Sequence, residues 1–280
     1  MTQLRQQMIR DMQLKRFSPR TQKSYLWAVT ELAKYYKQSP DKIEDKQIQD
    51  YLLYLMNERK LSWSTCDQQA SGIEFFTRTT LKREKSRFPL PRRRKAQRLP
   101  EILSAVEMER LFSSVRNPKH RMILMTAYGG GLRLNEVLHL KVTDIDSQRM
   151  MIRVEQGKGN KDRVTLLSQR LLGELRTYWK LYRPRVWLFP GRDPNKPLDA
   201  TSVQKIIIQA KKKAGIHKHG GIHMLRHCFG THLLEAGVDV RTIQSLMGHE
   251  HIQTTMRYMQ VTQKRVSSIP SPLDLLGRPN

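Results

Sequence analysis

The chain has 280 residues, with 51 Lys and Arg against 25 Asp and Glu, so its formal net charge is +26. This excess points to a polyanionic partner, either nucleic acid or an acidic membrane surface. No apolar stretch in the sequence is as long as a membrane-spanning helix requires, which is about 20 residues. The N-terminus lacks the apolar core of a signal peptide, and Cys66 and Cys228 form no disulfide framework. We therefore expect a cytoplasmic protein that binds nucleic acid and no membrane.

The first half of the sequence predicts a small all-helical domain at residues 1–83. Ser18 followed by Pro19 is typical of a helix start, and apolar residues then recur at helical spacing up to residue 37. The same spacing predicts further helices over residues 5–16, 48–60 and 64–82. Strand-like alternation does not occur before residue 100.

Residues 84–103 are predicted to form an extended basic linker, because Pro89 and Pro91 disfavour a helix. The linker contains four consecutive basic residues, Arg92, Arg93, Arg94 and Lys95. A nuclear-localisation-like patch is one interpretation of this run. Its position between two basic domains favours an arm that binds DNA by following the backbone.

Residues 104–262 predict a second domain, in which helices surround a small antiparallel β-sheet. Ser104 and Glu107 match a capping box. The segments "MMIRV" and "RVTLL" predict two strands, and "GKGNKD" between them suits a hairpin turn. Helices are predicted on both sides of the glycines at 129–131, over 168–182, 200–214 and 224–236, and in two short segments after these.

Two arginines stand where a site could form. Arg133 follows three glycines, which let a backbone approach closely, and Glu136 lies one turn further on and could orient it. His223 and Arg226 share one face of a predicted helix, beside an apolar stripe. Taken alone, Arg226 is equally compatible with an ordinary surface residue. For Arg133 with Glu136, a plain surface pair is the favoured interpretation in isolation.

Metal and nucleotide sites are not expected. The histidines at 217, 219, 223, 249 and 251 are not completed to a tetrahedral set by a cysteine or carboxylate. The segment "VEQGKGNKDRV" lacks the Ser or Thr and the spacing of a phosphate-binding loop. The carboxylate cluster of two-metal phosphoryl transfer is also missing. We therefore expect no metal and no cofactor.

Four segments, "GLRLNEVLHL", "GKGNKDR", "HMLRH" and "MGHEHIQTTMRY", occur in this order and resemble the tyrosine recombinases, also called phage integrases. The order and spacing are far more specific than any single segment, and the match covers most of residues 104–262. The resemblance implies a mostly α fold, in which an all-helical core-binding domain clamps DNA and an α+β catalytic domain follows. The simple two-domain type of the family is expected.

By this resemblance Tyr258 is the nucleophile, which attacks a DNA phosphodiester and forms a 3′-phosphotyrosyl bond. Arg133 and Arg226 would bind the non-bridging oxygens, and guanidinium geometry allows bidentate donation to them. Two fixed cations can stand in for a metal. The covalent bond conserves the phosphodiester energy, so religation needs no ATP.

The resemblance assigns the remaining roles as well. Lys158, in the hairpin, would protonate the leaving 5′-oxygen, and His223 would serve as acid or base at the tyrosine. His249 would donate to a non-bridging oxygen. Glu136 would orient the catalytic residues without itself contacting the phosphate. Gly248 is predicted to end one helix, and Thr254 or Thr255 to cap the helix that displays Tyr258.

The family resemblance also implies a homo-tetramer on paired DNA sites. The tail, residues 263–280, contains the apolar residues Ile269, Leu273, Leu275 and Leu276 between polar ones and would dock on a neighbouring protomer. A disordered or locally folded-back tail is the alternative. Two other functions stay open: a topoisomerase-like enzyme that nicks and closes DNA without defined sites, and a catalytically inactive DNA-binding protein. The intact set of candidate residues argues against the inactive protein.

Overall fold

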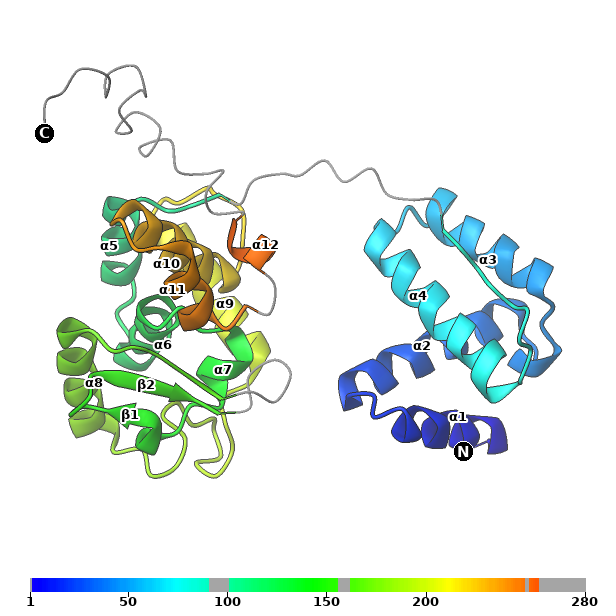
Figure 1. Ribbon diagram of the computed structural model, residues 1–280, viewed down its shortest axis with the longest axis horizontal. Helices are drawn as coiled ribbons and strands as arrows, with labels where there is room; N and C mark the ends of the chain where they lie inside the picture. The colour runs from blue at the N-terminus through cyan, green and yellow to red at the C-terminus, as the bar shows by residue number, and fades with distance from the viewer. Residues whose placement is uncertain (1, 91–100, 156–161, 250–251, 257–280) are drawn as a thin grey trace, which may run out of the picture. The chain divides into compact units, whose positions relative to one another are not determined.

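The computed structural model describes residues 2–90, 101–155, 162–249 and 252–256. The chain divides into two compact units, Met1–Ala96 and Gln97–Asn280, which are described separately (Figure 1). Among the described residues the fold is mostly helical with one small antiparallel sheet, as the sequence predicted.

The first unit is all-helical over its described residues. It consists of α1 (Gln3–Leu14), α2 (Pro19–Tyr36), α3 (Asp45–Asn57) and α4 (Trp63–Phe75), with a short 3₁₀ turn at Pro40–Lys42 and a π-helical turn at Phe76–Thr80. Ser18 caps α2 as predicted, since its hydroxyl accepts a hydrogen bond from the Thr21 amide at 3.1 Å. Helices α2 and α4 pack closely because Gly72 has no side chain: a Cβ there would lie 3.1 Å from the Ala28 Cβ.

The chain after α4 stays on this unit. Ser86 donates a hydrogen bond to Asp45 Oδ2 at 2.6 Å, and Phe88 is buried in the helical core. The basic residues Arg92, Arg93, Arg94 and Lys95 lie outside the described residues. Within the described parts of both units, no helix is long and apolar enough to cross a membrane.

The second unit surrounds a small sheet with helices. The helices are α5 (Ala105–Ser113), α6 (Pro118–Gly129), α7 (Leu134–Leu138), α8 (Gln169–Tyr182), α9 (Ala200–Lys213), α10 (His223–Glu235), α11 (Val240–Met247) and α12 (Ile252–Met256). A 3₁₀ turn at Val142–Asp144 leads to β1 (Ile145–Asp146), which is followed by β2 (Met151–Val154) and β3 (Arg163–Leu166). The sheet order is β1-β2-β3, antiparallel throughout, and Ile152 pairs with Thr165. The sequence predicted β2 and β3 but not β1, which is only two residues long.

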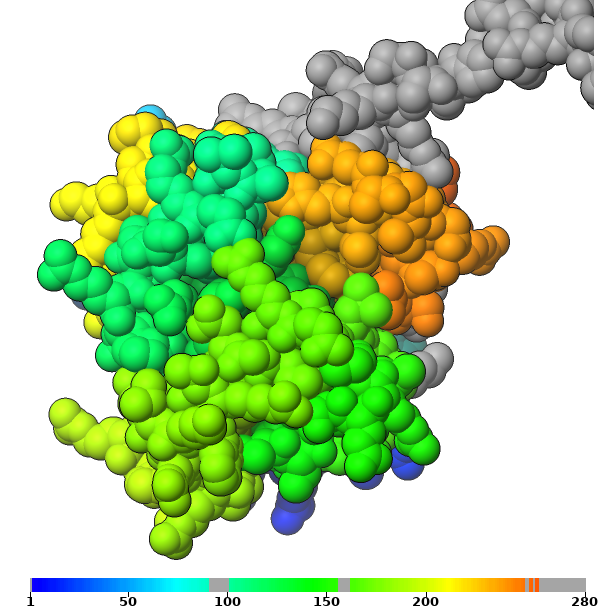
Figure 2. All heavy atoms as spheres, turned by 90° about the vertical axis from the view of Figure 1, so that its left-hand side faces the viewer, coloured from blue at the N-terminus to red at the C-terminus, as the bar shows by residue number. Residues whose placement is uncertain are grey.

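Helix α6 is the centre of this unit. Every residue from Met122 to Ala127 is buried, as expected of a helix that is apolar on all sides. It packs against α8 and α10, and Figure 2 shows the outer surface of the unit on the side of α5 and α8. Because α6 is enclosed, the turn that follows it is held at a fixed place in the interior.

Candidate active site

The turn between α6 and α7 brings backbone carbonyls against neighbouring elements. Gly131 has a φ of 58°, and a Cβ there would lie 2.3 Å from Phe229 Cδ1, so only glycine fits. The Gly131 carbonyl accepts a hydrogen bond from Arg226 Nη1 at 2.7 Å, and the Gly130 carbonyl accepts one from Thr165 Oγ1 at 2.9 Å. The close approach that the sequence predicted for these glycines is confirmed.

Arg226 is buried inside the unit, with 1% of its surface exposed. Besides the bond to Gly131, its Nη2 donates to the Met247 carbonyl, and its Nη1 lies 3.7 Å from Glu136 Oε2. A buried guanidinium is tolerated only when its charge and donors are matched. Burial therefore excludes the surface-residue interpretation of Arg226.

Arg133 is the residue before α7, and Glu136 holds it in two ways. The carboxylate accepts a hydrogen bond from the Arg133 backbone amide at 2.7 Å and one from Arg133 Nη1 at 2.8 Å. Arg133 Nη2 donates to the Gly248 carbonyl at 2.8 Å. The contact that the spacing of Arg133 and Glu136 suggested is therefore present.

A third arginine, Arg163 at the start of β3, joins the same carboxylate. Its Nη1 and Nη2 donate to the two Glu136 oxygens, each at 2.8 Å, and its Nε donates to the Leu246 carbonyl at 3.0 Å. Burial raises the pKa of Glu136, but the hydrogen bonds and charge of Arg163, together with the hydrogen bonds of Arg133, outweigh it and lower that pKa to about 2. Sequence analysis did not single out Arg163, although it closes the segment "GKGNKDR".

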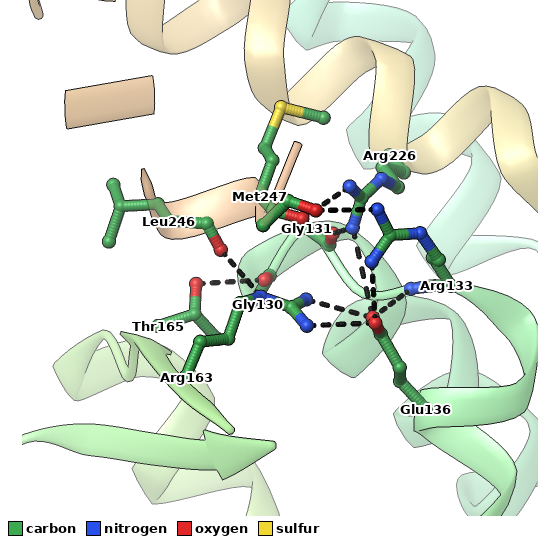
Figure 3. A network of polar contacts seen from close by, with 10 residues as sticks. Gly130, Gly131, Arg133, Glu136, Arg163, Thr165, Arg226, Leu246 and Met247 are labelled. Carbon is green, nitrogen blue, oxygen red and sulfur yellow. Dashed lines mark hydrogen bonds and ion pairs between the residues drawn. The ribbon is translucent and has the colours of Figure 1, made fainter. Parts of the chain in front are cut away.

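The arginines converge on the C-terminal end of α11 (Figure 3). Three successive carbonyls there, those of Leu246, Met247 and Gly248, accept from Arg163, Arg226 and Arg133 respectively. The last carbonyls of a helix lack intrahelical donors and carry partial negative charge, so cations are favoured at this end. The two arginines that the sequence placed in the site are thereby brought to one point.

Gly248 ends α11 as predicted, with a φ of 61°. A Cβ at this residue would lie 2.7 Å from Arg163 Cδ, so the glycine also makes room for the third arginine. The predicted cap at Thr254 or Thr255 is wrong, because α12 begins at Ile252 and both threonines lie within it.

His249 follows directly and is partly buried beside the arginines. Its Nδ1 lies 2.8 Å from Thr255 Oγ1, which ties it to α12. Burial, followed by the charges of Arg226 and Arg133, lowers the pKa of His249 to about 3. The imidazole is therefore neutral at pH 7 in the DNA-free protein, with one ring nitrogen carrying a proton.

His223 is the first residue of α10 and is exposed. Its ring meets that of His227 edge-on, with centroids 4.9 Å apart. Partial desolvation, followed by the charges of Arg226 and Arg133, lowers the pKa of His223. These charges place His223 within electrostatic reach of both arginines.

Two residues of the predicted site, Lys158 and Tyr258, lie outside the described residues. Those that are described, namely Arg133, Glu136, Arg226 and His249, gather around the end of α11, with His223 nearby. In the described parts of the chain, no three His, Cys, Asp or Glu side chains are grouped to hold a metal ion. That observation leaves metal independence as a prediction.

Comparison with known proteins gives concordant matches for both units. Residues 97–265 match the phage integrase family, and residues 4–87 match the N-terminal SAM-like domain of phage integrases. The integrase/recombinase y4qK of Sinorhizobium fredii is 44% identical to this chain, over 100% of this chain and 91% of its own length. An integrase/recombinase of Escherichia coli is 31% identical over 93% of this chain and 90% of its own length.

Solved structures agree in fold. The crystal structure of XerA recombinase has 27% identity and a TM-score of 0.56, over 94% of this chain and 95% of that one. XerH recombinase bound to its difH substrate after cleavage has 19% identity and a TM-score of 0.70, over 88% of this chain and 77% of that one.

The fold and the two matching domains define a protein of the tyrosine recombinase class. The chain belongs to the phage integrase family. It is a site-specific recombinase, an enzyme that cleaves and rejoins DNA strands.

Proposed function

We propose that this recombinase cleaves DNA with Tyr258 and neutralises the scissile phosphate with Arg133 and Arg226. The observation that carries the proposal is the meeting of both guanidinium groups at the end of α11, where the chain leads through His249 towards Tyr258. Phosphoryl transfer requires positioning and stabilisation of charge on the non-bridging oxygens. Arginines held by carbonyls and a carboxylate need no reorganisation during the reaction.

Proton transfers complete the reaction. Lys158 protonates the 5′-oxygen that leaves, while His223 accepts the proton of the tyrosine hydroxyl or returns it during religation. His249 donates to a non-bridging oxygen. A phosphate beside His249 favours its protonated form, so DNA binding raises its pKa from the low value of the free protein.

DNA contacts extend beyond the catalytic residues. Arg92, Arg93, Arg94 and Lys95 follow the DNA backbone in the linker between the helical core-binding domain and the catalytic domain. XerH is described as bound to difH, and the Tn1549 transposon integrase as complexed with a circular intermediate DNA. By analogy this chain binds double-stranded DNA in the cytoplasm.

Four protomers then exchange strands between two sites, one strand pair at a time. The apolar residues of the tail at 263–280, which lie outside the described residues, join neighbouring protomers. Mapping the cleavage sites of the enzyme would identify the DNA element on which it acts. For this, covalent protein–DNA complexes are trapped by adding denaturant to growing cells, and the attached DNA is sequenced.

A nicked duplex built on a mapped site tests the function and its metal independence together. The short released strand diffuses away, so the covalent protein–DNA adduct accumulates. Adduct formation should proceed at an unchanged rate in excess chelator, because guanidinium groups rather than a metal neutralise the phosphate. Loss of the adduct in chelator, with recovery on adding magnesium, would contradict the proposed chemistry.

The role of Lys158 is tested with a substrate that has sulfur at the bridging 5′ position. A thiolate leaves without a proton, so Lys158→Ala should cleave this substrate at nearly the wild-type rate. On ordinary DNA the same variant should be slower by about 10²–10⁴-fold, the range of general acid catalysis. Failure of the sulfur substrate to restore cleavage would exclude Lys158 as the acid and make Lys161 the next candidate.

A further inference from the structure

Arg163 occupies a distinctive place among the three arginines at the end of α11. Its three side-chain nitrogens all donate to protein acceptors, two to Glu136 and one to the Leu246 carbonyl. Its side chain is 10% exposed and that of Glu136 is 6% exposed, so the pair is shielded from water. A two-point fork of this kind fixes the plane of the carboxylate as well as its distance.

The fixed carboxylate in turn aims Arg133. Glu136 Oε1 accepts from Arg163 Nη1 and from Arg133 Nη1, both at 2.8 Å. Arg163 also anchors β3 to this region, together with Thr165, whose hydroxyl donates to the Gly130 carbonyl. Rotation of the carboxylate would therefore be transmitted to Arg133.

Charge gives Arg163 a second effect. Three arginines and one glutamate leave a net of two positive charges at the end of α11. Without Arg163 the net would be one, and Glu136 would compete with a phosphate for Arg133 and Arg226. In a site shielded from water, such a change in charge acts strongly on a phosphate that gains charge in the transition state.

We propose that Arg163 is a positioning residue for DNA cleavage: it fixes Glu136, which aims Arg133, and it cancels the carboxylate charge so that both catalytic arginines act on the scissile phosphate. The inference rests on the proposed function of Arg133 and Arg226. In this proposal Arg163 acts through Glu136 rather than on the reacting atoms.

The test compares cleavage of two nicked substrates under single-turnover conditions. One has an ordinary scissile phosphate, and the other has a methyl group in place of one non-bridging oxygen, which removes the negative charge. On the ordinary phosphate, Arg163→Ala should be slower by about 10²-fold, as expected for a misplaced catalytic group. On the methylphosphonate, the ratio of wild-type to variant rates should shrink to about tenfold or less, because there is less charge to neutralise.

Further variants separate the two effects and control for folding. Arg163→Lys keeps the charge but loses the fork, so its rate should lie between those of the wild type and Arg163→Ala. Arg163→Met combined with Glu136→Gln should be no slower than the slower of its two single variants, since both act through one contact. Arg170→Ala is the matched control, because Arg170 makes a two-point pair with Glu109 on an exposed surface. The Arg170→Ala protein should cleave both substrates at the wild-type rate.

The outcomes are distinct. If the wild-type protein forms no covalent DNA complex, either in cells or on nicked duplexes, the proposed function fails, and the inference fails with it. If the wild type cleaves and Arg163→Ala matches it within about threefold, too small a change for a catalytic positioning effect, only the inference fails. An equal loss on both substrates, accompanied by a lowered melting temperature and weaker DNA binding in a gel shift, would show a merely structural role and would also overturn it.

Discussion

Replacing Tyr258 by phenylalanine should abolish the covalent protein–DNA adduct and leave DNA affinity nearly unchanged. The substitution removes one oxygen and keeps the ring, so only the nucleophile is lost. Loss of a nucleophile lowers the rate of a covalent enzyme by roughly 10⁴-fold or more. The adduct is measured in a denaturing gel with the nicked substrate, and affinity is measured by gel shift.

Tyr182→Phe provides the matched control, because Tyr182 is an exposed tyrosine on α8 and should retain full activity. A covalent adduct formed by the Tyr258→Phe protein would remove Tyr258 from the mechanism. Mapping the modified peptide would then identify the residue that attacks DNA.

Arg226→Lys should be slower in cleavage by about 10²–10³-fold, the cost of losing one preorganised donor to a developing charge. Lysine keeps the positive charge but cannot donate to the Gly131 and Met247 carbonyls in the directions that the guanidinium uses. The variant should still bind DNA, since most affinity comes from the many phosphate contacts elsewhere. Single-turnover cleavage and gel shift measure the two quantities.

A melting experiment accompanies this comparison, because Arg226 is buried and its replacement also affects stability. Arg170→Lys, at the exposed pair on α8, should change neither rate nor melting temperature appreciably. A cleavage rate for folded Arg226→Lys within about tenfold of the wild type would show that any buried cation suffices, because loss of a preorganised donor costs more than this.

Much of the local structure could be predicted because local sequence causes it. Ser18 accepts from a first-turn amide of α2, and Ser104 with Glu107 closes a capping box on α5. The glycine before His249 ends α11 in the left-handed conformation. Each of these features depends on residues within one helical turn of each other.

The orientation of β3 could not be predicted in the same way. Alternation alone would bury Val164 and Leu166, yet they are 50% and 41% exposed. Arg163 and Thr165 point inwards instead, because the inner face of the strand meets the carboxylate of Glu136 and the carbonyl of Gly130. The usual apolar-inside pattern is reversed by polar partners distant in sequence.

The sequence by itself determined the helical first unit and the strand pair, since these follow from short-range spacing. The resemblance of four ordered segments to a known family indicated the family and the candidate residues. Only the tertiary structure decided that Arg226 is buried, that Arg163 joins Glu136, and that three arginines meet three carbonyls of α11. The contacts join α7, β3, α10 and α11, whose residues are up to 115 positions apart. Packing around α6 brings these elements together, and no periodicity in the sequence predicts that packing.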